Sequence, residues 1–312
     1  MNTLVTGGAG FIGSHIVERL LGEGHAVRVL DNFSTGKEEN LPDHSRLEIV
    51  RGGVEDFATV ERCVQGVDWI FHEAAIASVP KTIEDPLASQ RENYGGTLNL
   101  LEAARRHGRP RLVFAASAAA YGDLPGLPKT ETSPVRPLSP YAVDKLASEH
   151  ACAVYHTLHG LHTVCLRYFN VFGPRQDPSS PYSGVISIFT DHLLGDTTPT
   201  ILGDGEQTRD FVYVADVVDA NLRAITTEAA AGGRFNIGTG RVTTLNQLLD
   251  TLYRLRGRNP DPRHGPVRPG DIRHSCADIT LAEERLDWHP TVSLEEGLRH
   301  LLASLAAPRA TG

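Results

Sequence analysis

The sequence near the N-terminus reads Thr3-Leu4-Val5-Thr6-Gly7-Gly8-Ala9-Gly10-Phe11-Ile12-Gly13. Its first four residues have the pattern of a short buried strand, and an amphipathic helical pattern runs from the glycines to about Leu21. Gly8, Gly10 and Gly13 form G-x-G-x-x-G in the strand-turn-helix context that this motif requires. Missing side chains let the backbone approach a pyrophosphate, and the helix N-terminus attracts its charge. The stretch therefore predicts a dinucleotide-binding turn at the start of a parallel sheet.

A second apolar run, residues 26–30, ends in Asp31-Asn32. A glycine triplet alone is compatible with an ordinary tight turn, but an acid at this distance is where the adenosine ribose of a dinucleotide is bound. A carboxylate at Asp31 would also repel a 2′-phosphate, which favours NAD over NADP. We therefore predict NAD as the cofactor.

Further short apolar runs at residues 47–50, 69–72 and 111–116 alternate with segments of helical periodicity, including residues 97–104. Such runs are typical of strands that are covered on both faces. The pattern predicts an α/β protein with a doubly wound parallel (Rossmann) sheet. Ligands of these sheets bind beyond the carboxyl ends of the strands, and Ser117 stands at the end of one of them.

The segment Ser139-Pro140-Tyr141-Ala142-Val143-Asp144-Lys145 predicts a helix that begins at Pro140 and places Tyr141 and Lys145 on one face. An ammonium beside a phenol favours the phenolate, which lowers a tyrosine pKa from about 10 and suits the side chain to proton transfer. Alone, such a pair is more often two surface neighbours. The glycine-rich turn and Ser117 favour the catalytic interpretation here.

The composition excludes several other classes of protein. Acidic residues outnumber basic ones by 38 to 30, and the basic residues are scattered, which argues against nucleic-acid binding. No metal-ligand cluster such as H-E-x-x-H occurs, so we expect no metal. The sequence has no signal-peptide pattern and no membrane-spanning apolar run, so we expect a cytoplasmic protein. Reduced thiols are expected at Cys63, Cys152, Cys165 and Cys276, which have no CxxC spacing.

Taken together, the motifs resemble those of extended short-chain dehydrogenase/reductases that act on nucleotide sugars. Beyond the residues above, the resemblance rests on Asn93 before Gly96-Thr97, Tyr121-Gly122, Arg167-Tyr168-Phe169-Asn170, Gly203-Asp204-Gly205, Arg209-Asp210-Phe211 and Arg268-Pro269-Gly270-Asp271. Within that family the sequence is most similar to UDP-hexose 4-epimerases. The resemblance implies an NAD-binding Rossmann domain at residues 1–169 and a smaller α/β nucleotide-sugar-binding lobe at 170–312, with some later segments returning to the first domain.

The resemblance also implies roles for individual residues. It makes Ser117, Tyr141 and Lys145 catalytic. It places NAD against Gly7, Gly10, Phe11, Ile12, Gly13, Asp31, Asn32, Ser34, Gly36, Val54, Ala74, Ala75, Asn93, Tyr141, Lys145 and Tyr168. It places the UDP-sugar against Ser117, Tyr141, Asn170, Val185, Arg209, Arg268, Asp271 and Ser275. Two arginines suit a diphosphate because guanidinium groups bind phosphate oxygens in bidentate fashion, although solvated arginines are the ordinary alternative for either one alone.

In the implied mechanism, Tyr141 takes the proton of the sugar 4-hydroxyl, assisted by Ser117, while hydride passes from C4 to NAD. The 4-keto sugar then turns over in the site and accepts the hydride on its other face. Relatives that dehydrate or decarboxylate the keto sugar usually carry an acid in the two positions after Ser117. This chain has Ala118 and Ala119 there, which cannot transfer protons, so epimerisation is favoured.

The sequence leaves the substrate range open, and it leaves three alternatives to a UDP-hexose 4-epimerase. Ser275 matches a position that is small in epimerases accepting N-acetylated sugars, whereas Ala118 and Ala119 match serines in that branch. Gly53 stands where the family normally has an aspartate that touches adenine. The alternatives are a net NAD-dependent nucleotide-sugar oxidoreductase, a UDP-uronic acid 4-epimerase and a dinucleotide-sensing binding protein. The resemblance also implies a homodimer through the Tyr141 helix and the helix at residues 98–104.

Overall fold

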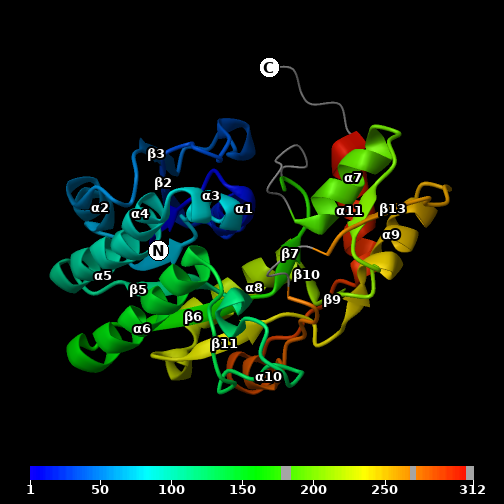
Figure 1. Ribbon diagram of the computed structural model, residues 1–312. Coiled ribbons are helices and arrows are strands. Elements are labelled where there is room, and N and C mark those ends of the chain that lie inside the picture. The colour runs from blue at the N-terminus through cyan, green and yellow to red at the C-terminus, as the bar shows by residue number, and fades with distance from the viewer. Residues whose placement is uncertain (177–183, 268–271, 307–312) are drawn as a thin grey trace.

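A sheet of seven parallel strands forms the centre of the protein in the computed structural model, which describes residues 1–176, 184–267 and 272–306 (Figure 1). The strand order is β11-β6-β5-β4-β1-β2-β3. The strands are β1 Asn2–Thr6, β2 Ala26–Asp31, β3 Leu47–Arg51, β4 Trp69–His72, β5 Arg111–Ser117, β6 Thr163–Tyr168 and β11 Arg234–Ile237. Because the order reverses between β1 and β4, the sheet is doubly wound and the predicted fold class is confirmed.

Helices cover both faces of this sheet. The helices are α1 Phe11–Gly22, α2 Phe57–Val64, α5 Gly96–Arg106, α6 Pro140–His159, α8 Val214–Thr226 and α10 Thr280–Leu286. Val5 packs in the core cluster that includes α1 and α8, whereas its neighbour Leu4 packs in the cluster that includes α2, α5 and α6. Successive strand residues point to opposite faces, so both side chains are fully buried.

A smaller part of the molecule carries its own core, at the right of Figure 1. Among the residues that the structure describes, this part contains three two-stranded sheets and three helices. The strand pairs are β7 Asn170–Phe172 with β10 Phe211–Tyr213, β9 Thr208–Arg209 with β12 Thr243–Thr244, and β8 Thr200–Leu202 with β13 Arg263–Gly265. The helices are α7 Val185–Leu194, α9 Leu245–Arg254 and α11 Leu294–Ala306. The later segments β11, α8 and α10 lie with the large sheet, although they follow residue 170 in the chain.

Short helical segments complete the connections. They are η1 Glu38–Asn40, α3 Val79–Glu84, α4 Pro86–Ser89, the π-helical η2 Gln90–Gly95, η3 Ala118–Tyr121 and η4 Glu228–Ala230. The cap of α9 is a complete capping box, in which Thr244 and Gln247 each accept a hydrogen bond from the other's backbone amide.

Two sequence expectations need correction. The apolar run at residues 47–50 predicts a strand covered on both faces, but β3 is the edge strand and Ile49 is 38% exposed. An edge strand lacks a neighbour on one side, so its helical cover is incomplete there. The apolar run Phe211-Val212-Tyr213-Val214 also predicts a strand, but the strand ends at Tyr213 and Val214 is the first residue of α8.

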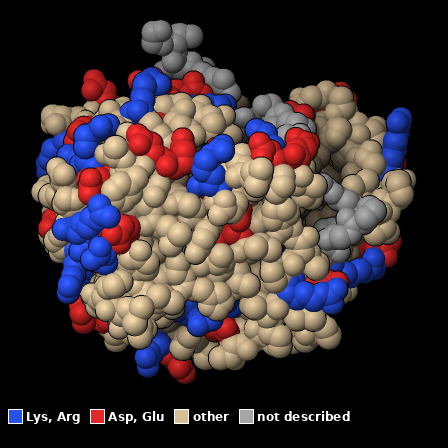
Figure 2. Space-filling view, turned by 60° about the vertical axis from the view of Figure 1, so that its left-hand side comes forward, with Lys and Arg blue, Asp and Glu red and all other residues tan. Residues whose placement is uncertain are grey.

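The surface charges and the helices bear on two other functions, nucleic-acid binding and membrane insertion. Basic and acidic side chains are interspersed on the face seen in Figure 2. Within the described ranges, no helix combines the length and apolarity needed to cross a lipid bilayer.

Candidate active site

Ser117, Tyr141 and Lys145 come together at the carboxyl end of the central strands. Ser117 is the last residue of β5, and Ser139 caps α6 by accepting a hydrogen bond from the Ala142 amide at 3.2 Å. The first turns of α6 thus lie over β5, where the Lys145 Nζ donates to the Ala115 carbonyl at 2.6 Å. The Ser117 side chain lies close enough to the Tyr141 phenol to favour its ionised form. The structure therefore joins the three residues that the sequence predicts to be catalytic.

The electrostatics of Tyr141 differ from the expectation. Burial raises the pKa of its phenol, the hydrogen bond to Ser117 opposes that rise, and the Glu73 carboxylate adds to it. The Lys145 Nζ lies 5.9 Å from the centre of the Tyr141 ring and 4.8 Å from that of Phe114. The pKa of Tyr141 is therefore raised and not lowered as expected, because removal from water disfavours the phenolate.

Lys145 is itself buried, and burial lowers its pKa to about 8. The negative charges of Glu73 and Asp144 oppose this effect and favour the protonated ammonium. Asp144 accepts a hydrogen bond from Ser89 at 2.5 Å, and both residues are buried. The Ala115 carbonyl therefore holds the ammonium inside the site, and the two carboxylates favour its positive charge.

Glu73 is a site residue that the sequence analysis did not identify. It follows the last residue of β4, and its carboxylate accepts a hydrogen bond from the Tyr168 hydroxyl at 2.9 Å. Burial raises its pKa to about 7, while Tyr168 and the Lys145 charge act in the opposite direction. The signal available in the sequence was an acid directly after a buried strand, at the edge where ligands of such sheets bind.

The glycine-rich turn is as tight as the motif predicts. Gly7 has a φ of +67°, and a Cβ atom there would lie 2.7 Å from the Ala74 amide nitrogen. A Cβ atom at Gly13 would lie 2.2 Å from the Gly7 carbonyl oxygen. The first hydrogen bond of α1 joins the Ser14 amide to the Gly10 carbonyl at 3.1 Å, so the preceding amides lack partners within the helix. They can donate to an anionic group at this end of α1.

Asp31 is fixed beside this turn. Its carboxylate accepts hydrogen bonds from the amides of Ala9 at 2.9 Å and Phe33 at 2.8 Å, and the residue is 7% exposed. The loop folds closely around it, since a Cβ atom at Gly36 would lie 2.9 Å from one carboxylate oxygen. Each oxygen keeps further acceptor capacity for ribose hydroxyls. Turn and carboxylate together fit a dinucleotide without a 2′-phosphate.

Other residues assigned to the cofactor by resemblance shape the neighbouring loops. Asn32 accepts from the Ser34 amide at 3.0 Å. Asn93 binds the loop after β4, because its Oδ1 accepts from the Ile76 amide at 2.8 Å. Val54 is buried, and the loop of Ala74 and Ala75 faces the glycine turn.

Gly53 has an unexpected neighbour. A Cβ atom at Gly53 would lie between 2.0 and 2.3 Å from the carboxylate atoms of Glu55. The Glu55 side chain therefore fills the space that a side chain at position 53 would take. The Asn99 side chain fixes the backbone here by donating to the carbonyls of Val54 at 2.9 Å and Glu55 at 3.1 Å.

Apart from Ser117 and Tyr141, the described residues that are predicted to bind the substrate lie in the smaller part. Asn170 begins β7, Val185 begins α7, and Arg209 lies on β9. The Ser275 amide donates to the Thr208 carbonyl at 3.2 Å, so Ser275 lies beside Arg209. Arg268 and Asp271, the remaining two, lie outside the described residues.

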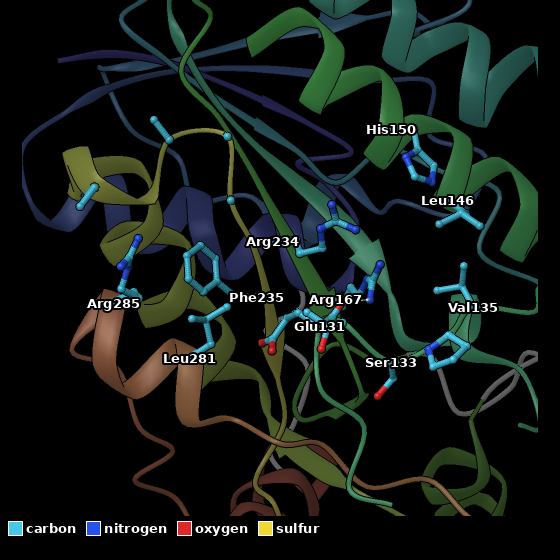
Figure 3. A pocket seen from close by; sticks show the side chains of 16 residues that line it. Glu131, Ser133, Val135, Leu146, His150, Arg167, Arg234, Phe235, Leu281 and Arg285 are labelled. Atoms are coloured by element: carbon cyan, nitrogen blue, oxygen red, sulfur yellow. Dashed lines mark hydrogen bonds between the residues drawn. The ribbon is translucent and has the colours of Figure 1, made fainter. Parts of the chain in front are cut away.

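A cavity of about 650 Å³ lies elsewhere and is shown in Figure 3. Residues of the 131–135 segment, α6, β11 and α10 line it, and the described residues along its wall include none of Ser117, Tyr141 and Lys145. Its most buried charge, Arg167, is already paired with Glu149 at 2.6 Å. This cavity is therefore separate from the residues that carry the predicted chemistry.

Comparisons with known proteins agree with this geometry. The model of the NAD dependent epimerase/dehydratase family matches residues 3–238. A UDP-N-acetylglucosamine 4-epimerase from Methanobrevibacter ruminantium M1, in complex with UDP-N-acetylmuramic acid, is 39% identical, with a TM-score of 0.93 and 97% of each chain covered. A UDP-glucose 4-epimerase from Thermotoga maritima, with UDP-glucose, is 42% identical, with a TM-score of 0.93 and 98% of each chain covered. The UDP-glucose 4-epimerase of Thermus thermophilus, in complex with NAD, is 41% identical, with a TM-score of 0.90; 99% of this chain and 100% of that chain are covered.

Proposed function

Because this chain belongs to the NAD-dependent epimerase/dehydratase family, we propose that it inverts the configuration at C4 of a UDP-hexose. The observation that carries the proposal is the convergence of Ser117, Tyr141 and Lys145 at the carboxyl end of β5, followed directly by Ala118 and Ala119. Two hydroxyls and an ammonium can accept the proton of one sugar hydroxyl and return it. The two alanines supply no extra acid or base for eliminating water or losing a carboxyl group.

NAD is the proposed cofactor. The amides at the start of α1 would face its pyrophosphate, and the Asp31 carboxylate would accept hydrogen bonds from its adenosine ribose. When bound, NAD supplies a reversible acceptor for the hydrogen on C4 of the sugar. The relative from Thermus thermophilus, crystallised with NAD, supports this assignment.

The protein's own residues would handle the proton. Tyr141 takes the proton of the sugar 4-hydroxyl and returns it after the sugar has turned over, and Ser117 shares the hydrogen bond. Lys145 keeps a positive charge inside the site, which stabilises the negative charge that develops on the phenol oxygen. Because desolvation raises the pKa of Tyr141, little of its ionised form is present at neutral pH before substrate and cofactor complete its surroundings.

The proposed substrates are UDP-glucose and UDP-galactose, together with their N-acetylated counterparts. Arg209 and Ser275 lie side by side next to Thr208, and a small residue at position 275 leaves room for an acetamido group. The similar proteins include one that acts on UDP-N-acetylglucosamine and one crystallised with UDP-glucose, which supports both classes.

Incubation of the purified protein with UDP-galactose, UDP-N-acetylgalactosamine and UDP-galacturonic acid, each with and without added NAD, tests the proposal. Anion-exchange separation should reveal the gluco partners of the first two. Conversion of the uronic sugar alone would identify a UDP-uronic acid 4-epimerase. Stoichiometric NADH with an oxidised sugar would identify a net oxidoreductase, and no conversion in any arm would contradict the proposal.

We also propose that the protein is a homodimer formed through α6 and α5. Three apolar side chains of α6 are exposed at 50% or more, namely Val143, Val154 and Leu158. They recur at spacings of eleven and four residues, which places them on one stripe of the helix. A second copy packed on this stripe would remove them from water.

A further inference from the structure

Glu73 ends a chain of hydrogen-bonded side chains that begins at Asn221 on α8. The Asn221 Nδ2 of α8 donates to the Tyr168 hydroxyl at 2.7 Å, and that hydroxyl donates to the Glu73 carboxylate at 2.9 Å. Asn221 is fully buried and Tyr168 is 8% exposed, so both bonds are shielded from water. The backbone of Glu73 is also fixed, because its amide donates to the Thr6 carbonyl at 3.1 Å. The carboxylate therefore has a defined position between β4 and β6.

The charged side of Glu73 faces the catalytic helix. In the described part of the chain, the ionisable groups that act on it are Tyr168 from β6 and Lys145 from α6, while Glu73 in turn acts on Tyr141. His72, its neighbour on β4, stays neutral because burial lowers its pKa to about 3. The carboxylate thus adjoins both the group that must lose a proton and the group that must keep one.

We propose that Glu73 is a positioning residue of the proposed epimerase, whose carboxylate holds Tyr168 and sets the pH range over which Tyr141 and Lys145 have the protonation states that the reaction needs. The inference rests on the proposed function. Nothing in the proposed reaction requires Glu73 to touch the sugar, so its influence is electrostatic.

The direction of the effect follows from the signs of the charges. Ionised Glu73 disfavours a second negative charge on Tyr141 and favours the positive charge on Lys145. Removing the negative charge therefore lets both groups lose their protons at lower pH. The pH profile of the activity depends on the ionisation of both Tyr141 and Lys145. Both limbs should move in the same direction.

Glu73→Gln is the informative variant, because glutamine keeps the shape and still accepts a hydrogen bond from Tyr168. We expect both limbs of the kcat–pH profile for UDP-galactose to shift to lower pH by about one unit, the size typical of a nearby charge. The matched control is Glu131→Gln, which removes another half-buried carboxylate with a raised pKa that accepts a hydrogen bond from the Asn236 amide. Its profile should coincide with that of the unmodified protein.

A second readout does not depend on turnover. The ultraviolet absorbance of phenolate, titrated in the unmodified protein and in E73Q, each minus the same background carrying Tyr141→Phe, isolates the ionisation of Tyr141. This ionisation should occur at lower pH in E73Q. Unchanged titrations and unchanged limbs, with only a uniform loss of kcat, would overturn the inference. Absence of epimerase activity with a shifted Tyr141 titration would instead refute the proposed reaction while supporting the role of Glu73.

Discussion

At the scale of single residues, the site depends on groups whose protonation is set by burial. The spacing of Tyr141 to Lys145 predicts a proton-transfer residue, and the structure adds that burial works against its ionisation. Sequence spacing reports which side chains share a helix face, but it carries no information on how completely water is removed from them. The direction in which the pKa of Tyr141 shifts could therefore not be predicted from the sequence.

Replacing Tyr141 by phenylalanine removes the hydroxyl and keeps the ring. We expect kcat for UDP-galactose to fall by about 10²- to 10⁴-fold, the usual contribution of a general acid–base group. Steady-state kinetics would measure the change. Tyr253→Phe is the control, since this buried tyrosine lies on α9, and its loss should alter kcat by no more than about twofold. Equal effects of the two variants would refute the catalytic role.

His72 gives a prediction about stability and pH. Its Nδ1 accepts from the Thr6 hydroxyl at 2.8 Å, and its Nε2 donates to Thr97 at 3.0 Å, because the Thr97 hydroxyl itself donates to the Asn93 carbonyl at 2.7 Å. Protonation would break the bond to Thr6. Burial, and after it the Lys145 charge, lowers the pKa of His72 in the folded state to about 3, against 6.5 for an ordinary histidine.

Since the unfolded chain binds this proton more readily, stability is fully present above pH 6.5 and is lost as the pH falls towards about 3. The contribution of His72 should approach about 1.4 kcal/mol per pH unit inside that interval. Urea unfolding of the unmodified protein and of His72→Gln at several pH values would measure it. The variant should show a shallower dependence, and parallel slopes would contradict the account.

At the scale of elements, the sequence was most informative where local rules determine the outcome. The glycine motif and the start of α6 at Pro140 both follow from short-range signals. The exposure of β3 could not be predicted in this way, because its place at the sheet edge depends on strand order and not on its own residues.

The turn before α1 offers a matched pair of glycine substitutions. Gly13→Ala would force a Cβ atom to within 2.2 Å of the Gly7 carbonyl oxygen, whereas Gly22→Ala, at the end of the same helix, meets no atom within 4 Å. We expect Gly13→Ala to weaken NAD binding at least about tenfold, since overpacking costs about 1–3 kcal/mol. Titration with NAD would measure this.

Gly22→Ala is the control for helix content and chain entropy. It should leave NAD binding unchanged and alter stability by less than about 1 kcal/mol. Equal affinity of both variants for NAD would show that the turn does not hold the cofactor.

At the scale of the whole molecule, the resemblance to known families predicted most of the architecture and the convergence of Ser117, Tyr141 and Lys145. It did not predict Glu73 or the way in which Glu55 fills the space at Gly53. Neither Glu73 nor Glu55 belongs to the motifs on which the resemblance rests. They could be found only once the strands had been placed beside one another.

The proposed dimer can be tested with residues of nearly equal exposure. Leu158 on α6 is 70% exposed, and Val267, outside α5 and α6, is 68% exposed. Leu158→Glu should convert particles of twice 33.8 kDa into monomers in light scattering, because a buried unpaired charge opposes association. Val267→Glu should leave the dimer intact. A monomeric mass for the unmodified protein would refute the proposed dimer.

The most direct test of the proposed reaction uses UDP-galactose that carries deuterium at C4. If Tyr141 moves only the hydroxyl proton and the hydrogen on C4 leaves and returns within the closed site, the UDP-glucose formed should retain the deuterium at C4 in mass spectra and NMR. Replacement of that deuterium by hydrogen from water would contradict the account.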